Sequence, residues 1–354
     1  MSVKLSAHRG TSLVLTALLA LGVTIAGCSG GDEDAMDEPV TFPALDGYQP
    51  MDIPADNPMT AEKVELGRLL YYDTRMSGDG QRSCYSCHLP EHGLTDGRPL
   101  AIGAFDRTLT RSSPTMWNIG YHEAWYWDGR AATLEGQALA AWRGGNMGAS
   151  GNDGAPSAED VCATLDGIAA YHDQFQAVFG SGCTPENASR ALAVFMRTIV
   201  STDSPWVRFR NGDASALSEA AQRGYTLFNE KAGCATCHSG LLLTDLQYHN
   251  VGTGMNAENP DPGRFSVTKD EADRGKFKTP TLMDISRSAP YFHDGSVATL
   301  EEAVDQMLAG GIANPNLDVN LKPVELTSQE RAELLQFLRE LTATYTIAAP
   351  TLPR

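Results

Sequence analysis

Two short cysteine motifs carry the clearest chemistry in this sequence. One reads Cys-Tyr-Ser-Cys-His and the other Cys-Ala-Thr-Cys-His. Two thiols three positions apart can reach both vinyl groups on one porphyrin edge, and the histidine that follows then lies under the iron. A single copy could be a chance match, or a zinc or redox site. Two copies that both end in histidine predict two covalent c-type haems, with thioether bonds and axial ligands at Cys84, Cys87, His88, Cys234, Cys237 and His238.

The N-terminus has the features of an export signal. Two basic residues precede an apolar stretch, Leu13–Ile25, that is too short to span a bilayer as a helix. The run Ile-Ala-Gly before Cys28 resembles a bacterial lipobox, which implies that residues 1–27 are removed and that Cys28 carries lipid. An ordinary signal with a chance cysteine is the alternative. Residues 28–52 are typical of a solvated acidic, Gly-rich tether, and by resemblance Ser29 favours the outer membrane, so we expect a lipid-anchored periplasmic protein.

The chain has seven cysteines, and an odd count in an exported protein needs an explanation. Four belong to the haem motifs and Cys28 would take lipid. Cys162 and Cys183 remain, and the periplasm is an oxidising compartment. We therefore predict a disulfide between these two.

Composition and charge restrict the class of protein. The 354 residues are 42% hydrophobic, 20% charged and 8% aromatic, which excludes a disordered, collagen-like or polytopic membrane protein. The formal charge is −17, from 27 basic and 44 acidic side chains. Such a surface repels phosphate backbones, so nucleic acid is not an expected partner, whereas a basic protein would suit it.

An internal duplication organises the chain. The two haem motifs are 150 positions apart, and each is followed by Leu-Thr-Asp. Residues 113–135 match the stretch 166 positions later without a gap, including Trp-Asp-Gly against His-Asp-Gly. We therefore predict two tandem haem domains, residues 53–210 and residues 211–348, which meet at the polar turn Asn211–Asp213.

Helices account for most of the remaining pattern. Thr299 with Glu302 and Thr327 with Glu330 form capping boxes ahead of apolar stripes, and Thr184 precedes a third helix. Alternating strand patterns are scarce, and Gly and Pro mark long loops. The fold class predicted is mostly α, with two cytochrome c-like domains whose long loops surround the haems.

The sequence resembles the bacterial di-haem cytochrome c peroxidases and their methylamine-utilisation relatives. The resemblance covers nearly all of residues 53–345 and rests on both haem motifs, on Trp127–Arg130 and on Ala289–Gly295. It implies that hydrogen peroxide is reduced to water at the N-terminal haem. Electrons would come from a small donor protein, cytochrome c or a copper protein, and enter at the C-terminal haem. It also leaves open a homodimer.

The resemblance assigns roles to further residues. Met307 stands where the peroxidases have a thioether ligand to the electron-accepting haem, and the methylamine-utilisation relatives have tyrosine there. Alternatively, Met307 is a core residue on the apolar face of its helix. Trp127 matches a tryptophan between the haems, as a relay or as interface packing, and Gln137 matches a glutamine of the peroxide pocket. His293 stands at the position of the second copy that corresponds to Trp127, where it would contact the surroundings of the haem without ligating the iron.

Two departures from the family pattern affect the peroxide site. Ala104 stands where many peroxidases have a histidine that closes the N-terminal iron at rest, so we expect an open iron. Asn146 stands in the segment that carries the catalytic glutamate, and asparagine cannot transfer the proton that O–O cleavage needs. The alternatives are a substitute carboxylate or a Met147 that ligates the iron itself; the candidate carboxylates are Glu123, Asp128 and Glu135.

The family also holds a calcium ion between its domains, mostly through carbonyl groups. The family also uses an asparagine, and Ser112 stands at that position here, with Ser288 and Pro290 on the other side, so calcium is left open. Most other histidines are expected to form loop or surface hydrogen bonds, namely His92, His122, His172 and His249.

Three functions are consistent with the sequence. A di-haem peroxidase is favoured. The missing glutamate favours a di-haem oxidase that modifies a protein substrate, whereas Met307 is evidence against it. An electron-transfer lipoprotein without enzymatic activity is favoured only if Asn146 and a ligating Met147 remove the peroxide site.

Overall fold

Helices begin where the sequence supplies capping side chains. In the computed structural model, which describes residues 41–354, Thr184, Thr299 and Thr327 each accept a hydrogen bond from a backbone N–H of the first turn. The latter two form full capping boxes, as predicted. The signal segment, Cys28 and the beginning of the tether lie outside the described residues.

The described chain is mostly helical, as predicted. Its strands, β1 (Tyr248–His249) and β2 (Phe277–Lys278), pair antiparallel with Tyr248 opposite Lys278. No helix within residues 41–354 has the length and hydropathy needed to cross a bilayer. The α-helices are α1 (Ala61–Tyr72), α2 (Leu134–Arg143), α3 (Ala158–Asp166), α4 (Ala169–Phe179), α5 (Pro185–Met196), α6 (Pro205–Arg210), α7 (Glu219–Asn229), α8 (Phe265–Thr268), α9 (Leu300–Leu308) and α10 (Ser328–Glu340).

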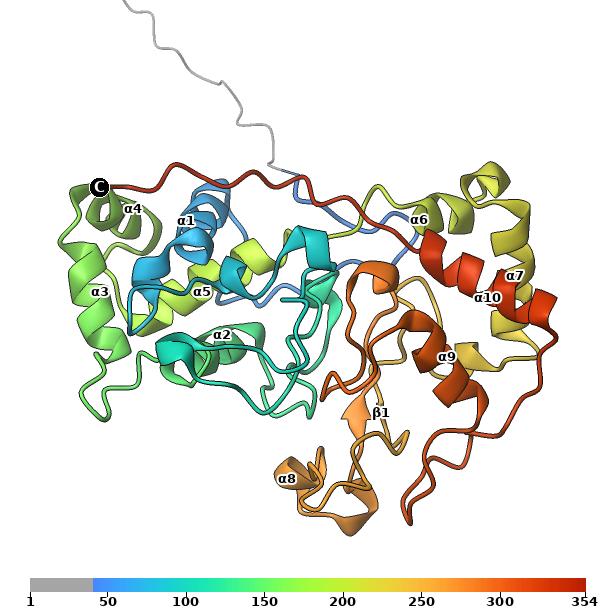
Figure 1. The fold of residues 1–354 in the computed structure, drawn as a ribbon. Helices are drawn as coiled ribbons and strands as arrows, with labels where there is room; N and C mark the ends of the chain where they lie inside the picture. Colours follow the sequence, from blue (N-terminus) through green and yellow to red (C-terminus); the bar gives the residue numbers. More distant parts are fainter. Residues whose placement is uncertain (1–40) are drawn as a thin grey trace, which may run out of the picture. The chain divides into compact units, whose positions relative to one another are not determined.

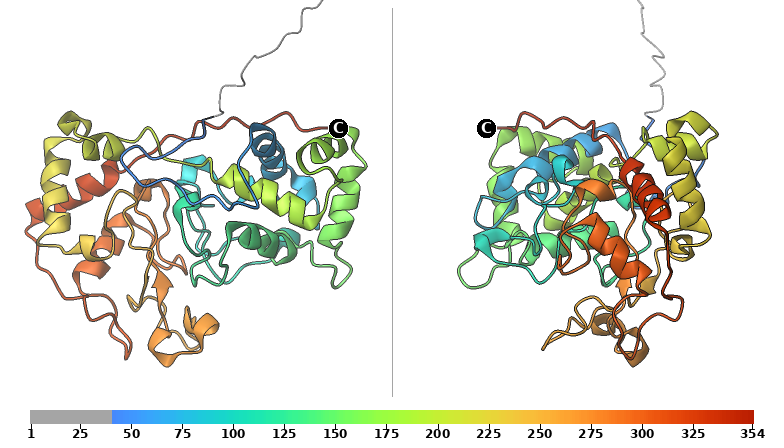
Figure 2. Two further views of the ribbon diagram at one scale, coloured as in Figure 1. Left: turned by 180° about the vertical axis from the view of Figure 1, so that it is seen from behind. Right: turned by 45° about the vertical axis from the view of Figure 1, so that its right-hand side comes forward.

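The duplication is visible in how the helices pack. Helix α1 lies against α5 and helix α7 lies against α10 (Figures 1 and 2). Each pair makes its closest approach at a glycine: Gly67 faces the backbone of Ala191, and Gly224 faces the backbone of Glu333. Helices α2 and α9 then occupy corresponding places, each starting from a capping threonine.

The backbone conformation of the loops is repeated in the two copies, as the helices are. Asn118 and Asp284, 166 positions apart, both have left-handed backbone, with φ of 60° and 64°. Tyr126 and Phe292, at the same offset, have φ of 67° and 70°. Each Asp-Gly turn is closed by an isolated bridge, Trp125 to Ala131 and Tyr291 to Val297. Residues that rarely adopt positive φ do so here in pairs, which shows that the two copies share one loop conformation.

The region around the predicted domain boundary belongs to the C-terminal helix group. Trp206 of α6 packs edge-on against Tyr225 of α7 and Phe337 of α10, and its indole N–H donates to the Leu241 carbonyl. The boundary at 211 stays a prediction.

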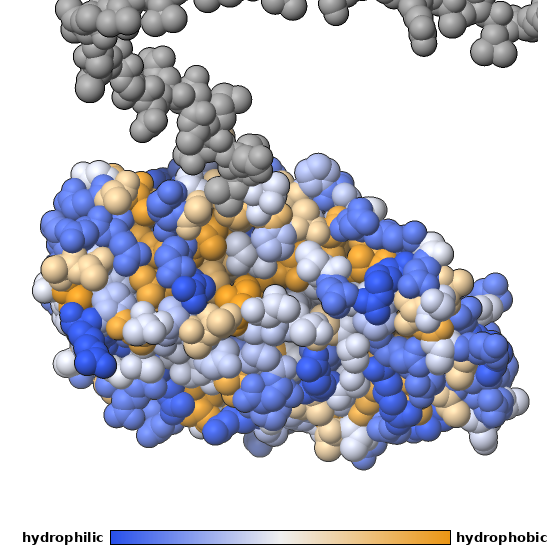
Figure 3. Space-filling view, turned by 90° about the horizontal axis from the view of Figure 1, so that it is seen from above, coloured by the Kyte–Doolittle hydropathy of each residue, from blue (hydrophilic) through white to orange (hydrophobic). Residues whose placement is uncertain are grey.

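A disulfide and the C-terminal segment each join separate parts of the described chain. A disulfide joins Cys162 of α3 to Cys183, with a Cα–Cα distance of 5.2 Å. The segment after α10 runs back past α1 (Figure 1), where Arg68 and Arg75 donate to the carbonyls of Ala348 and Pro353. On the face seen in Figure 3, apolar side chains lie among hydrophilic ones rather than in one continuous patch.

We expect the Gly67→Ala substitution to destabilise the protein by about 1–3 kcal/mol, because the added methyl overlaps the Ala191 carbonyl and lies 2.7 Å from the Phe195 Cβ. Gly167→Ala at the end of α3 is the matched control, since the nearest atom to its methyl would be the Thr164 carbonyl oxygen at 3.3 Å. Urea unfolding of both variants measures the difference. Equal stabilities would contradict the close helix crossing.

Candidate haem sites and the interface between them

Both motif histidines are held in the same way. His88 Nδ1 lies 3.0 Å from the Leu94 carbonyl, and His238 Nδ1 lies 3.1 Å from the Leu243 carbonyl. Leu94 and Leu243 have left-handed backbone, which turns each carbonyl toward its histidine. Because a carbonyl only accepts, Nδ1 carries the proton and the Nε2 lone pair is free for a metal. Burial lowers the pKa of both imidazoles, which favours the neutral, ligating form.

The motif cysteines suit thioether attachment. They lie in two 3₁₀ turns, Cys84–Ser86 and Cys234–Thr236, each placed after the first helix of its copy. All four thiols are free, whereas the other two cysteines of the described chain form the disulfide. A C-x-x-C pair kept apart beside a histidine with a free Nε2 fits a covalent haem better than a redox disulfide. The residues present therefore fit two c-type haems.

Trp127 lies at the contact between the two copies. Its indole N–H donates to the Ser112 carbonyl at 2.9 Å, and the Ser112 N–H donates to the His293 carbonyl at 2.7 Å. From the second copy, the Lys278 N–H donates to the Trp127 carbonyl at 2.8 Å. The predicted relay tryptophan is thus joined by hydrogen bonds to its own duplicate, His293. Its role in electron transfer stays a prediction.

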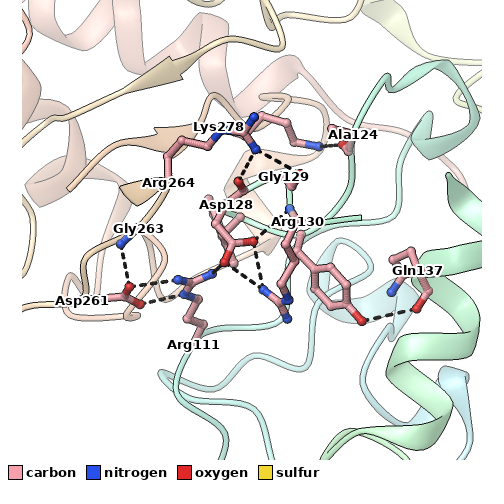
Figure 4. Close-up of polar contacts among 12 residues, drawn as sticks. Arg111, Ala124, Asp128, Gly129, Arg130, Gln137, Asp261, Gly263, Arg264 and Lys278 are labelled. Atoms are coloured by element: carbon pink, nitrogen blue, oxygen red, sulfur yellow. Dashed lines mark hydrogen bonds and ion pairs between the residues drawn. The ribbon is translucent and has the colours of Figure 1, made fainter. Parts of the chain in front are cut away.

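An arginine that the sequence did not single out links the copies. Arg111 pairs with Asp128 of the first copy at 2.8 Å and with Asp261 of the second at 2.7 Å (Figure 4). Its guanidinium lies 5.3 Å from the Phe277 ring centre, and that ring stacks on His293 at 3.6 Å. The two ion pairs fix the loop that carries Trp127.

The same loop is held from its other side. Arg264 donates to the carbonyls of Asp128 and Gly129 (Figure 4), and a Cβ at Gly129 would overlap the Tyr248 hydroxyl. In the duplicate loop, a Cβ at Gly295 would overlap the backbone of Pro99 in the first copy. Each Asp-Gly turn is therefore covered by the other copy, which requires glycine at both turns.

The two departures from the family pattern lie side by side. The Ala104 N–H donates to the Asn146 carbonyl at 3.0 Å. The loop around Ala104 is fixed by a hydrogen bond from the Phe105 N–H to Asp79 at 2.6 Å and by an ion pair of Arg82 with Asp106. The Asn146 side chain is exposed. The Ala104 side chain cannot ligate a metal, because it has no donor atom.

The carboxylates proposed as substitutes for the missing glutamate are differently placed. Burial alone would raise the pKa of Glu135, but hydrogen bonds from Arg197 and Asn57 outweigh it and lower the pKa. Asp128 is buried between Arg111 and Arg130. Glu135 is therefore poorly suited to carry a proton, and Asp128 is engaged by two arginines. Glu123 is exposed and, among the described residues, has no hydrogen-bond partner.

The other peroxide-site residues lie on or beside α2. Gln137 is half-buried on that helix, and its backbone carbonyl accepts a hydrogen bond from the Tyr126 hydroxyl (Figure 4). Met147 follows the helix and is buried in the main core at 6% exposure. Core packing therefore explains the burial of Met147, and ligation of the haem iron is not needed to explain it.

Met307 has a different environment from its helix neighbours. Leu300, Ala303 and Val304 form the buried face of α9, and Leu308 packs against the core. Met307 is half-buried and does not belong to that core cluster. Its thioether is therefore not needed for packing, which is consistent with the predicted ligand role without testing it.

Lys278 is a buried cation in the interface that sequence patterns gave no reason to select. Its ammonium donates to the Ala124 carbonyl at 2.5 Å and to His122 Nδ1 at 3.1 Å. His122 Nε2 is buried and has no partner among the described residues. Burial lowers the pKa of Lys278 to about 8. His122, predicted as a loop or surface residue, thus lies at the contact between the copies.

The remaining predicted positions have ordinary contacts. The Ser112 carbonyl accepts from Trp127 and the Ser288 hydroxyl donates to the Ile285 carbonyl, so calcium at Ser112, Ser288 and Pro290 stays a prediction. His249 is paired with Asp245 and Asp318. Donor atoms of Cys237, Asp245 and His249 lie within 4.8 Å of one another, but Cys237 belongs to a haem motif.

Comparisons with known proteins agree with this geometry. Residues 61–215 match a family model described as di-haem cytochrome c peroxidase. The chain is 37% identical to the cytochrome-c peroxidase IdrP1 of Denitromonas iodatirespirans, over 94% of this chain and 93% of that protein. It is 39% identical to the methylamine utilization protein MauG of Methylorubrum extorquens, over 85% and 83%. The crystal structure of a MauG-like protein associated with microbial copper homeostasis is 36% identical, covers 86% of this chain and 95% of its own, and has a TM-score of 0.75.

We expect Lys278 to make stability depend on pH between about 8 and 10.5. The folded pKa is lowered, so in this window the unfolded state binds more protons and stability rises with pH. Relative to Lys278→Met, the native protein should gain at most roughly 3 kcal/mol from the lower to the upper limit. Urea unfolding across the window measures this, with Lys322→Met as the control for loss of an exposed lysine. Parallel pH courses of native protein and Lys278→Met would contradict the burial of the charge.

Proposed function

Because the chain belongs to the di-haem cytochrome c peroxidase family, we propose that it reduces hydrogen peroxide to water with electrons from a small donor protein. It is an oxidoreductase of that family, and a peroxidase and a protein-modifying oxidase are both consistent with membership. The observation that carries the proposal is the hydrogen-bonded bridge from Trp127 through Ser112 to His293, which connects the two copies. A peroxidase needs such a connection, because electrons enter in one half and peroxide reacts in the other.

When bound, the haems supply one iron that takes peroxide and a second centre that takes up electrons from the donor. His88 and His238 offer Nε2 to these irons in a fixed tautomer. Met307 would be the second ligand in the C-terminal half, where a thioether raises the reduction potential. Ala104 has no ligand atom, so a haem held by His88 would receive no second ligand from this position.

The reaction consumes two electrons and two protons for each peroxide, and it yields two water molecules. Trp127 would pass the electrons across the interface. Gln137 would orient peroxide by hydrogen bonding. The proton between the two oxygens has no carboxylate carrier at position 146, so we infer that water in the exposed space beside Asn146 performs this transfer at reduced efficiency.

A protein-modifying oxidase is the second candidate. Asn146 favours it, and so do the arginine pairs that occupy Glu135 and Asp128, because all three reduce the supply of protons for rapid peroxide cleavage. Met307 favours the peroxidase. Export to the periplasm, a lipid anchor at Cys28 and a homodimer are further parts of the proposal and rest on sequence resemblance.

The assay that tests the proposal is oxidation of reduced cytochrome c by added peroxide. We expect turnover by the native protein, and a gain on the order of tenfold or more in Asn146→Glu, which restores a titratable group in the exposed loop. Asn152→Glu, at an exposed loop position beyond the peroxide site, is the control. Turnover below about one per second in both native protein and Asn146→Glu, with two haems attached, would reject the peroxidase and favour the oxidase.

We expect EPR of the oxidised protein to show one high-spin and one low-spin haem. The high-spin centre follows from Ala104, which leaves the His88 iron open, and the low-spin centre from ligation by His238 and Met307. In Met307→Leu the low-spin signal should be lost, whereas Leu308→Met on the next position should leave both signals unchanged. Two low-spin centres in the native protein would contradict the open iron.

A further inference from the structure

Tyrosine rings form a continuous path that begins inside the first haem motif. Tyr85 lies between the two cysteines of that motif, and its ring centre is 4.6 Å from that of Tyr72 on α1. The Tyr72 hydroxyl is 2.9 Å from the Tyr345 hydroxyl. Tyr345 belongs to the segment after α10, and its ring lies 6.3 Å from that of the buried Trp117. Three segments distant in the sequence therefore bring oxidisable rings together.

The three tyrosines of the path are each partly exposed. Tyr85, Tyr72 and Tyr345 are all half-buried, so part of each remains in contact with solvent. The segment that carries Tyr345 is fastened to the N-terminal half by Arg68, which donates to the Ala348 carbonyl at 2.9 Å. The segment is not part of either haem motif. Its hydrogen-bonded contact with Tyr72 extends the path to a third segment of the chain.

The duplicate copy shows that folding does not require these tyrosines. Tyr85 corresponds to Ala235 at the offset of the haem motifs. When α1 and α7 are aligned on Gly67 and Gly224, Tyr72 corresponds to Asn229. The same helix–motif unit thus folds without tyrosine at these two positions. The aromatic residues near His238 come from other positions, among them Trp206 and Tyr225.

The hydroxyl groups are arranged for loss of a proton with an electron. Tyr72 donates to the Ile347 carbonyl at 3.4 Å, so in the pair of hydroxyls Tyr345 donates to Tyr72. A phenol that loses an electron also releases its proton, so the Tyr345 proton can move along this hydrogen bond to an oxidised Tyr72 together with the electron. Tyrosine and tryptophan are the side chains most readily oxidised by one electron in this way.

We propose that Tyr85, Tyr72 and Tyr345 conduct oxidising equivalents from the His88 haem to the surface, where phenols too large for the peroxide pocket are oxidised. This activity rests on the proposed reaction with peroxide. One peroxide accepts two electrons and two protons from two phenol molecules, which gives two water molecules and two phenoxyl radicals. The radicals couple in solution to diphenols. The electrons enter through the tyrosines rather than through the His238 haem.

The experiment uses the holoenzyme with peroxide and tyramine coupled to dextran, a phenol that cannot enter an interior pocket. Diphenol fluorescence measures the product. We expect Tyr72→Phe and Tyr345→Phe to lose on the order of tenfold in this rate while peroxide-dependent oxidation of cytochrome c is unchanged. Tyr48→Phe is the matched control, because Tyr48 packs edge-on against Tyr121 in a separate pair.

A readout independent of turnover is the tyrosyl radical itself. Freeze-quenched EPR after peroxide addition without a donor should show a radical that is diminished in Tyr345→Phe, and mass spectrometry should locate oxidation at Tyr85, Tyr72 or Tyr345. Wild-type radical signals and dextran oxidation in both phenylalanine variants would overturn the inference alone. Lack of peroxide consumption with either reductant would overturn the proposed function and the inference together.

Discussion

A hydrogen bond from each motif histidine to a backbone carbonyl is the constraint on which both sites depend. It determines which ring nitrogen faces the metal, and it forces Leu94 and Leu243 into left-handed backbone. Strain of this kind persists only where surrounding structure holds it. The surrounding structure here is a pair of crossed helices joined at a glycine, present once in each copy. The duplication thus preserves the helices and also the conformation that orients the ligands.

The contact between the copies is polar, which distinguishes it from the helix crossings. Arg111 satisfies Asp128 and Asp261 together, and Lys278 donates to carbonyl and imidazole acceptors. A buried charge is costly unless every one of its partners is in place, so such a contact tolerates few alternative arrangements. An interface of this kind fixes the position of Trp127, which its proposed role as an electron relay would require.

Much of this structure could be predicted from local patterns. The capping threonines, the haem motifs and the mostly helical fold depend on residues a few positions apart, and their chemistry is explicit in the sequence. Arg111 with Asp261 and Lys278 with His122 are separated by 150 and 156 positions. The repeat places each residue within its own copy, but it carries no information on how one copy faces the other. For this reason the residues that fix Trp127 were missed, although Trp127 itself was found.

The contact between Ala104 and Asn146 changes how the two departures from the family should be interpreted. They are 42 positions apart in the sequence and would count as independent losses, one of a ligand and one of a proton carrier. In the structure the backbone of one donates to the backbone of the other, so both lie at one place beside the first haem motif. The absence of a ligand side chain at position 104 and of a carboxylate at position 146 therefore alters one place in the structure rather than two. Under the proposed function, this place would take protons from water or release oxidising equivalents elsewhere, and the tyrosines of this half would offer the second route.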